Sequence, residues 1–138
     1  TVFRNDDNDA THSFQFNQID IFQIGKDVSI ANLKWTLDTL LEKIFEEKLE
    51  VRYRPSYFPF TEPSFEVDIK RSGDDSWIEI LGCGMIHPEV IRKAGKDPEK
   101  LQGFAAGIGL ERIAMLKYGI TDIRDFITND IDFLKGVK

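Results

Sequence analysis

The sequence of 138 residues is poor in the residues that build disulfides and metal clusters, with one cysteine, Cys83, and two histidines, His12 and His87. A single cysteine excludes a disulfide within the chain and any cysteine-based zinc cluster. Two histidines make a multi-histidine metal site unexpected. This sparing use of cysteine agrees with a reducing, cytoplasmic setting.

The sequence also lacks long apolar runs and an excess of positive charge. No apolar stretch approaches the roughly 18 residues that predict a membrane span, so we expect no membrane segment. The 24 acidic side chains outnumber the 18 lysines and arginines, which gives a formal net charge of −6. Domains that bind nucleic acid on their own are usually basic. The chain as a whole is therefore not expected to hold RNA by its field, although single cationic residues can still serve an anionic ligand.

Hydrophobic periodicity predicts a hairpin and a long helix in the first third of the sequence. Residues 2–4 and 13–24 are expected to form two paired strands, joined by the acidic, turn-rich loop 5–9. Apolar residues then recur at helical spacing from Ile30 to Phe45, behind Ser29 as a plausible N-cap. We interpret this segment as an amphipathic packing helix.

The remaining elements are shorter. In chain order we first expect a strand at 51–54 that ends at Pro55, and then a fixed but non-regular run at 57–60. Two strands follow at 65–69 and 77–81, joined by a turn at 72–75, and the second of them ends at 82–84. The rest of the chain is expected to form a short helix at 88–94, a strand at Gly103 that leads into a helix ending at Tyr118, and a mixed segment at 123–134. Antiparallel strands with segregated helices indicate an α+β fold, an antiparallel β-sheet flanked by helices. The length suits one domain.

The segment from Gly103 to Arg112 is the most informative for function. Small residues run directly into Glu111 and Arg112, and a helical apolar run follows. Small residues let a ligand approach the backbone, and an arginine on the first turn of a helix suits a bidentate grip on phosphate or stacking on a base. The alternative is a glycine-rich junction at which Glu111 and Arg112 are merely solvated.

Polar side chains in the first hairpin form a second candidate group. Arg4 can neutralise a phosphate or carboxylate, or make an ordinary surface ion pair. His12 can donate to a phosphate, or act as a solvated or capping residue. Gln18 and Asp20 are two residues apart, so they share one face of the strand with Phe16. That face is either a ligand floor or a half-buried surface.

Aromatic residues and carboxylates form a third group. Phe58 and Phe60 could form two walls of a flat slot for an aromatic guest, although core packing is the commoner fate of phenylalanine. Glu62 and Glu79 flank these elements, and magnesium often takes one or two protein carboxylates together with substrate phosphates. Cys83 is expected to be a small buried residue rather than a nucleophile.

Four motifs, taken in order, resemble one family. They are Phe3-Arg4-Asn5-Asp6 with Asp9-Ala10-Thr11-His12, Arg54-Pro55-Ser56-Tyr57-Phe58-Pro59-Phe60-Thr61-Glu62-Pro63, Leu81-Gly82-Cys83-Gly84-Met85-Ile86-His87-Pro88, and Gly107-Ile108-Gly109-Leu110-Glu111-Arg112. The chain is thereby similar to the catalytic α subunit of phenylalanyl-tRNA synthetase of bacterial type, a class II aminoacyl-tRNA synthetase. The first motif looks like class II motif 2 and the last like motif 3. The resemblance covers residues 1–138 and implies a partial catalytic domain without motif 1 or the N-terminal coiled coil.

The resemblance implies an ATP site with two catalytic arginines, Arg4 and Arg112. Arg4 is implied to hold the α-phosphate and the carboxyl end of the amino acid. Phe16 and Arg112 are implied to sandwich the adenine ring, with Arg112 also beside the terminal phosphates. His12 is implied to contact the phosphate region.

The resemblance also implies a phenylalanine site and a metal ligand. Gln18 and Asp20 would take the α-amino group. Phe58 and Phe60 would cradle the substrate ring, with Ala105 at the end of its pocket. Glu62 would bind a Mg²⁺ ion shared with the β subunit. Family members often have Glu at the position of Asp20, and many have Phe at the position of Ala106.

The implied activity is ATP-dependent activation of phenylalanine to phenylalanyl-adenylate and transfer of the phenylalanyl group to tRNA(Phe). The implied assembly is an (αβ)2 heterotetramer of two α and two β subunits. Because the chain begins without methionine inside a strand, we expect a fragment that is inactive by itself. Two other hypotheses are a non-catalytic paralogue that binds nucleotide or amino acid, which the presence of Arg4 and Arg112 disfavours, and a structural scaffold whose phenylalanines are core.

Overall fold

The computed structural model describes residues 1–5, 9–73 and 75–136. The chain divides into two compact units, one of Thr1–Ile19 with Gly109–Lys138 and one of Asp20–Ile108. No helix in these described ranges is long and apolar enough to cross a membrane.

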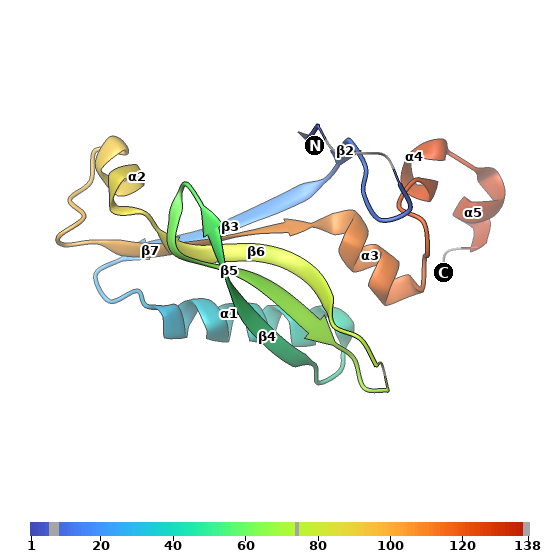
Figure 1. Ribbon diagram of the computed structural model, residues 1–138, viewed down its shortest axis with the longest axis horizontal. Helices are drawn as coiled ribbons and strands as arrows, with labels where there is room; N and C mark the ends of the chain where they lie inside the picture. The colour runs from blue at the N-terminus through green and yellow to red at the C-terminus, as the bar shows by residue number, and fades with distance from the viewer. Residues whose placement is uncertain (6–8, 74, 137–138) are drawn as a thin grey trace. The chain divides into compact units, whose positions relative to one another are not determined.

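The larger unit is built on a five-stranded sheet with the spatial order β3-β7-β6-β5-β4 (Figure 1). Its strands are β3 (Gln18–Gly25), β4 (Glu50–Phe58), β5 (Thr61–Lys70), β6 (Ile78–Ile86) and β7 (Gln102–Gly109). Strands β4 to β7 pair antiparallel in succession in space, β4 with β5, β5 with β6 and β6 with β7. The expected antiparallel sheet is confirmed.

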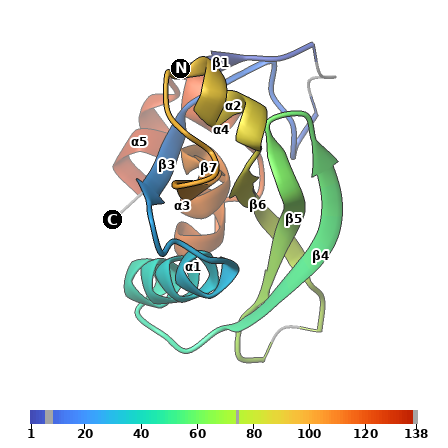
Figure 2. The same cartoon turned by 90° about the vertical axis from the view of Figure 1, so that its left-hand side faces the viewer.

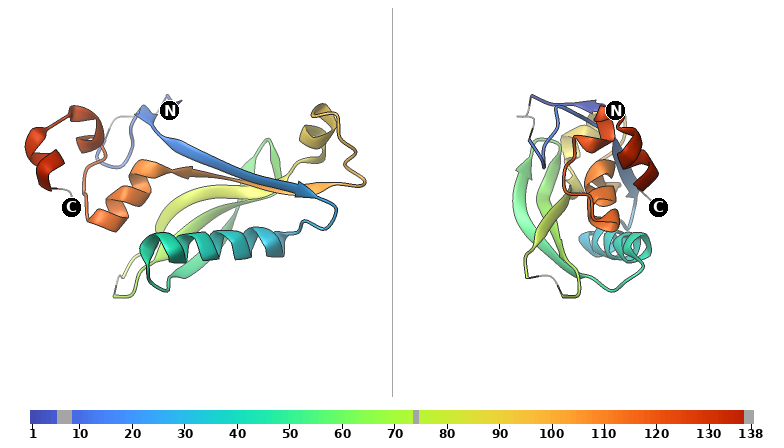
Figure 3. Two further views of the ribbon diagram at one scale, coloured as in Figure 1. Left: turned by 180° about the vertical axis from the view of Figure 1, so that it is seen from behind. Right: turned by 90° about the vertical axis from the view of Figure 1, so that its right-hand side faces the viewer.

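Helix α1 (Ile30–Phe45) lies along one face of this sheet (Figures 1 and 3). The predicted helix and its N-cap are confirmed, because the Ser29 hydroxyl accepts from the Asn32 N–H while the Asn32 side chain accepts from the Ser29 N–H at 2.9 Å. This capping box satisfies N–H groups that the start of a helix leaves open. Leu33, Leu37 and Leu41 are fully buried. Burial of each stabilises the unit by roughly 1.5–3 kcal/mol.

The predicted end of a strand at Pro55 is wrong. Strand β4 continues through Pro55, which stands opposite Phe65, and extends to Phe58. Because β4 lies at the edge of the sheet, no strand among the described residues pairs with one side of its backbone, and a residue without an N–H is tolerated there. The run at 57–60, predicted to be non-regular, is strand at Tyr57 and Phe58 and turn at Pro59 and Phe60, before β5 begins.

Strand β6 likewise extends beyond its predicted end at 82–84. A Cβ atom on Gly84 would lie 2.5 Å from the carbonyl oxygen of Pro63. Glycine therefore allows a close approach of β5 at this position and does not end the strand. The predicted short helix is confirmed as α2 (Pro88–Lys93), visible in Figure 2. The predicted turn at 72–75 includes Asp74, which lies outside the described residues.

The smaller unit begins with a two-stranded antiparallel sheet of β1 (Val2–Phe3) and β2 (Gln15–Phe16), in which Val2 stands opposite Phe16. The predicted hairpin is confirmed, but the predicted strand 13–24 is divided at Asn17 into β2 and β3. Within the predicted acidic loop, residues 6–8 lie outside the described residues.

The helices of the smaller unit follow β7. Helix α3 (Leu110–Tyr118) ends at Gly119, whose φ of 69° is left-handed and suits glycine. The expected strand-to-helix step and the end of the helix are therefore confirmed. The segment expected to be mixed contains two short helices, α4 (Asp125–Thr128) and α5 (Ile131–Gly136) (Figure 3).

Candidate active site

Arg4, directly after β1, is held by two groups that carry no charge. Its Nη2 donates to Oε1 of Gln18 at 3.2 Å, and its guanidinium lies over the ring of Phe16, 4.9 Å from the centroid. The main-chain N–H of Arg4 donates to the carbonyl oxygen of Phe14 at 2.9 Å, which extends the pairing of the two strands. Arg4 is exposed. An exposed guanidinium fixed by neutral partners keeps its charge for an anionic ligand.

His12 lies in the loop after β1 and is held by Asp9. Oδ1 of Asp9 accepts from the main-chain N–H groups of Thr11 and His12, both at 2.7 Å, and Nδ1 of His12 lies 3.2 Å from the same oxygen. The hydrogen bonds from Thr11, and then that from His12, lower the pKa of Asp9 well below its usual value. Because Asp9 engages Nδ1, a ligand would meet Nε2 of His12.

Arg112, on the first turn of α3, reaches the loop that carries His12. Its Nη2 donates to the carbonyl oxygen of Thr11 at 3.0 Å. The structure thus brings together two residues predicted to contact phosphates. The arginine that lies over the Phe16 ring is Arg4, and the sandwich of adenine between Phe16 and Arg112 stays a prediction.

Glu111 has a structural role that sequence reasoning missed. It is 8% exposed, and both of its carboxylate oxygens accept from the main-chain N–H of Asn17 at 2.9 Å, while Oε1 also accepts from Asn17 Nδ2 at 2.8 Å. The alternative of a merely solvated Glu111 is therefore wrong. A carboxylate on the first turn of a helix is favoured by the helix dipole. Its partner lies 94 residues away in the sequence, so no local pattern could have identified the pair.

In the larger unit, the sheet face opposite α1 carries a floor of small residues. Gly82 stands opposite Gly107, and Gly84 stands opposite Ala105. The ring of Phe58 lies over this floor, because a Cβ atom on Gly82 would lie 3.0 Å from Cζ of that ring. Ala105 is therefore a floor residue in the same sheet that carries Phe58, and its place at the end of a ring pocket stays a prediction.

Phe58 and Phe60 do not form two facing walls. Their rings are nearly parallel, with 8° between the planes and 5.9 Å between the centroids. A guest ring between parallel rings needs a gap of about 7 Å, so the prediction of a slot between them is wrong. The two rings stack on one another and present a continuous aromatic surface, with Phe60 56% exposed.

Cys83 and Ala106 stand opposite one another on the sheet face turned to α1. Cys83 also pairs with Phe65, whose ring packs edge-on against Tyr53, and the Tyr53 hydroxyl donates to Asp38 of α1 at 2.8 Å. Burial raises the pKa of the Cys83 thiol to about 12. Cys83 is thus a buried packing residue, as predicted, and Ala106 lies on the opposite face from Ala105.

Glu62, the predicted metal ligand, is largely exposed, and its Oε2 lies 3.5 Å from Nε2 of His87. No group of three or more potential metal ligands occurs among the described residues. Glu62 would therefore contribute a single carboxylate, which fits the way Mg²⁺ is held by one or two carboxylates and substrate phosphates. Asp20, the predicted ligand of the amino group, is an exposed residue of β3.

Glu79 is far from Glu62 and belongs to a different cluster. It stands opposite Asp68, while Thr61 at the start of β5 stands opposite Ile86, which separates the two glutamates by roughly 20 Å along the strands. Nη2 of Arg54 donates to Glu79 at 3.1 Å. These two glutamates cannot share one metal ion.

Asp68 is the centre of that cluster, and sequence reasoning did not identify it. It is 2% exposed and accepts from Arg52 at 2.7 and 2.9 Å and from Arg54 at 2.6 and 2.9 Å. These hydrogen bonds, those from Arg54 first, lower the pKa of Asp68. Arg52 also lies over the Trp77 ring, 4.4 Å from its centroid. Because each charge here has a partner, the cluster stabilises the sheet.

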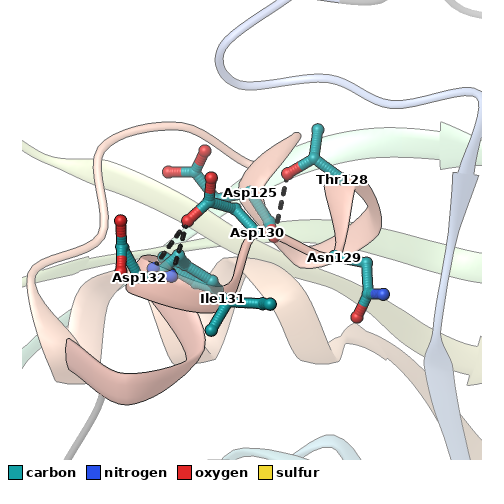
Figure 4. A pocket seen from close by; sticks show the side chains of 7 residues that line it. Asp125, Thr128, Asn129, Asp130, Ile131 and Asp132 are labelled. Carbon is teal, nitrogen blue, oxygen red and sulfur yellow. Dashed lines mark hydrogen bonds between the residues drawn. The ribbon is translucent and has the colours of Figure 1, made fainter.

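A shallow depression in the smaller unit contains none of the predicted site residues (Figure 4). Its carboxylate Asp130 accepts from the main-chain N–H groups of Asp132 and Phe133, both at 2.9 Å. The depression is lined by Asp125, Thr128, Asn129, Asp130, Ile131, Asp132 and Phe133. Its three aspartates disfavour an anionic ligand, and the oxygen of Asp130 is already used by the turn into α5.

Curated relatives match nearly the whole chain. The phenylalanine–tRNA ligase alpha subunit of Proteus mirabilis (strain HI4320) is 53% identical over 99% of the chain, and that of Bacillus licheniformis is also 53% identical over 99% of the chain. The chain spans 41% and 43% of the length of these two relatives.

Solved structures and a family profile agree with these relatives. Two structures of pyrrolysyl-tRNA synthetase from Desulfitobacterium hafniense superpose with TM-scores of 0.59 and 0.61 at 18% identity, over 99% of this chain and 45% of each of theirs. At that identity the similarity shows the fold alone, and it confirms the expected class II fold. The profile described as tRNA synthetases class II core domain (F) matches residues 1–137. The chain therefore belongs to the family of class II tRNA synthetase core domains (F).

Proposed function

We propose that this chain forms part of the catalytic site of a phenylalanine–tRNA ligase, which activates phenylalanine with ATP and transfers it to tRNA(Phe). The choice of amino acid is supported by relatives of that name at 53% identity over 99% of the chain. The observation that carries the proposal is the geometry of Arg4, an exposed cation fixed beside an aromatic ring and an amide oxygen.

In the first step, a carboxylate oxygen of phenylalanine attacks the α-phosphorus of ATP. The new phosphorus–oxygen bond forms as the bond to pyrophosphate breaks, which yields phenylalanyl-adenylate. Negative charge accumulates on the α-phosphate in the transition state, and Arg4 neutralises it while it holds the incoming carboxylate. No protein nucleophile takes part. Positioning of the two substrates supplies most of the remaining acceleration.

The other ATP contacts are assigned to the smaller unit. His12 and Arg112 bind the terminal phosphates, a role supported by the contact between Arg112 and Thr11, the neighbour of His12. One face of the Phe16 ring is covered by Arg4. Adenine therefore stacks on the other face of Phe16, with Arg112 on the far side of the base.

Phenylalanine is assigned to the residues around its amino group and its ring. Gln18 and Asp20 receive the ammonium group, with the amide oxygen of Gln18 already oriented by Arg4. The stacked pair Phe58 and Phe60 covers the substrate ring from one side, and Ala105 limits the length of the pocket.

The size of Ala105 gives a direct test of this pocket. Ala105→Gly removes one methyl group and is expected to raise kcat/KM for para-chlorophenylalanine by about 10-fold relative to phenylalanine, since one methyl-sized change is worth about 1–3 kcal/mol in an apolar pocket. Ala106→Gly, on the opposite face of the same strand, is the matched control and is expected to leave selectivity unchanged. Equal selectivity of Ala105→Gly and the parent enzyme would remove Ala105 from the pocket.

Glu62 would hold one Mg²⁺ ion, which supplies charge neutralisation to the phosphates when bound. Its exposed carboxylate and the neighbouring imidazole of His87 support this assignment. The name of the relatives, an alpha subunit of phenylalanine–tRNA ligase, supports a β subunit and tRNA(Phe) as partners. The family resemblance adds the proposals that the β subunit shares the ion, that a second α subunit completes an (αβ)2 heterotetramer, and that the location is cytoplasmic.

The test is phenylalanine-dependent exchange of pyrophosphate into ATP by the full-length α subunit purified with its β subunit. We expect exchange with phenylalanine and not with the other amino acids, and no exchange by the 138-residue chain alone. Binding of a phenylalanyl-adenylate analogue without exchange would favour the non-catalytic paralogue. Absence of both binding and exchange would favour the scaffold.

A further inference from the structure

Asn17 is bound on three sides by two consecutive residues at the start of α3. Its main-chain N–H and its Nδ2 donate to the carboxylate of Glu111 at 2.8–2.9 Å. Its carbonyl oxygen accepts from the main-chain N–H of Leu110 at 2.8 Å. Thr1 Oγ1 donates to Oδ1 of Asn17 at 2.9 Å, so the side-chain amide oxygen is also engaged.

The Glu111 carboxylate is well suited to hold a main-chain segment. It is 8% exposed, so an unpaired charge there would be costly, and three hydrogen bonds from Asn17 compensate for the lost water. The helix dipole at the start of α3 favours the same negative charge. The segment around Asn17 therefore has one preferred position relative to α3.

Asn17 stands between two residues of the proposed site. It lies between Phe16, the last residue of β2, and Gln18, the first residue of β3. Arg4 contacts both of these neighbours, the Phe16 ring at 4.9 Å and the Gln18 amide at 3.2 Å. Any shift of Asn17 moves the two groups that hold the Arg4 guanidinium.

The hydrogen bonds between Glu111 and Asn17, called the clamp below, end next to Arg112 on the side of α3. Glu111 immediately precedes Arg112 on the first turn of α3, and the Phe16 ring reaches within 4.0 Å of the Cβ position of Gly109. The Glu111 carboxylate therefore ties the segment that positions Arg4 to the turn that carries Arg112.

We infer that Glu111 is a positioning residue, which acts through Asn17 to set the arrangement of Arg4, Phe16 and Arg112 for ATP. The inference rests on the proposed function. It predicts that loss of the clamp raises the KM for ATP and lowers kcat, because misplacement of a substrate-positioning group by about 1 Å costs up to about 100-fold in rate.

The test is pyrophosphate exchange by full-length α subunit with its β subunit, carrying Glu111→Gln, Asn17→Asp or both. Glu111→Gln places an amide NH2 against the N–H donors of Asn17, and Asn17→Asp places two carboxylates together. Each single variant is expected to lose about 10- to 100-fold in kcat/KM for ATP. In the double variant the glutamine carbonyl oxygen can accept from the residue 17 N–H and its NH2 can donate to the aspartate, so most of the loss is expected to be recovered.

Two further variants distinguish positioning from folding. Glu89→Gln makes the same chemical change at an exposed glutamate on the first turn of α2, and is expected to stay within about twofold of the parent enzyme. Asn17→Ala removes the Nδ2 contact and leaves the main-chain hydrogen bonds. It replaces Glu111→Gln as the test variant if Glu111→Gln does not fold. Its KM for ATP is expected to rise by about threefold or more.

The outcomes separate the two proposals. In one outcome the parent enzyme exchanges pyrophosphate, and the folded Glu111→Gln or Asn17→Ala variant has the same KM and kcat for ATP as the parent. This outcome overturns the positioning role alone. A lower melting temperature, with kcat reduced but the KM for ATP unchanged and no recovery in the double variant, identifies Glu111 as purely structural and also overturns it. A parent enzyme without exchange overturns the proposed function and this inference with it.

Discussion

Arg4 in the smaller unit and the pair Arg52 and Arg54 in the larger unit are held in opposite ways. In the smaller unit, Arg4 contacts the amide oxygen of Gln18 and the face of the Phe16 ring. In the larger unit, Arg52 and Arg54 both donate to the carboxylate of Asp68, which is 2% exposed.

The difference separates arginines that stabilise the fold from one that is available to a ligand. The guanidinium groups of Arg52 and Arg54 are compensated by Asp68, and Arg54 also pairs with Glu66 at 2.9 Å and Glu79 at 3.1 Å. Among the described residues, the partners of the Arg4 guanidinium are neutral, so its charge remains for a phosphate or a carboxylate. An arginine motif in a sequence does not distinguish these two cases, because the partners come from other strands.

The largest expected effect follows from removing the two kinds of arginine in turn. Arg4→Ala in the full-length ligase is expected to lower kcat/KM for phenylalanine-dependent pyrophosphate exchange by about 10²- to 10³-fold, the usual loss for one charge-stabilising donor. Its free energy of unfolding should change by less than about 0.5 kcal/mol, since Arg4 is exposed. Arg52→Ala should lower stability and leave exchange within about threefold. If both variants lose activity and stability to the same extent, the comparison between the units fails.

The next effect concerns the buried carboxylate. Asp68→Asn leaves two guanidinium groups facing a neutral amide, and is expected to lower the free energy of unfolding by about 3 kcal/mol, near the low end for a broken buried pair because both arginines are partly exposed. The measurement is urea denaturation of the 138-residue chain. Glu79→Gln, at a side chain that is 54% exposed, is the control and should cost less than about 1 kcal/mol. Equal costs for the two changes would show that Asp68 is not the centre of the cluster.

A smaller effect is the dependence of stability on acid. The hydrogen bonds from Arg54 and Arg52 lower the pKa of Asp68 in the folded chain, so its contribution is fully present above the unfolded value of about 3.9 and is lost as pH falls through the folded pKa. The unfolding free energy of the parent chain should therefore fall below about pH 4, and that of Asp68→Asn should fall less. Urea denaturation from pH 7 to pH 2 measures both. Parallel curves would mean that Asp68 is not held ionised by the arginines.

Much of the fold follows from local sequence patterns. The 3.6-residue periodicity of 30–45 and the Ser29 cap are sufficient for α1, since each acts within one or two turns of the chain. Alternation and turn residues likewise predicted the first hairpin and the antiparallel strands. Pro55 was misjudged because its tolerance depends on β4 being an edge strand, a property of the whole sheet.

The candidate site was predictable to a smaller extent. The family resemblance identified Arg4, His12 and Arg112 as candidate ligands of phosphate, and the structure adds a contact for each, with Gln18, Asp9 and the Thr11 carbonyl oxygen respectively. It corrected the arrangement of Phe58 and Phe60, because ring stacking depends on the turn between β4 and β5. No pattern in the sequence indicated Glu111 or Asp68 as centres of hydrogen bonding, since a carboxylate reveals its importance only through its partners.

The sequence by itself determined the α+β class, the capped helix α1, the strand-to-helix step at Gly109 and the family, because these depend on short-range periodicity, caps and motifs that lie within a few residues. Tertiary structure decided which charges are neutralised and which are kept. Asp68 meets Arg52 across β4 and β5, and Glu111 meets Asn17 across 94 residues. Such contacts depend on strand register and on the folding of distant segments onto one another, which no local spacing records.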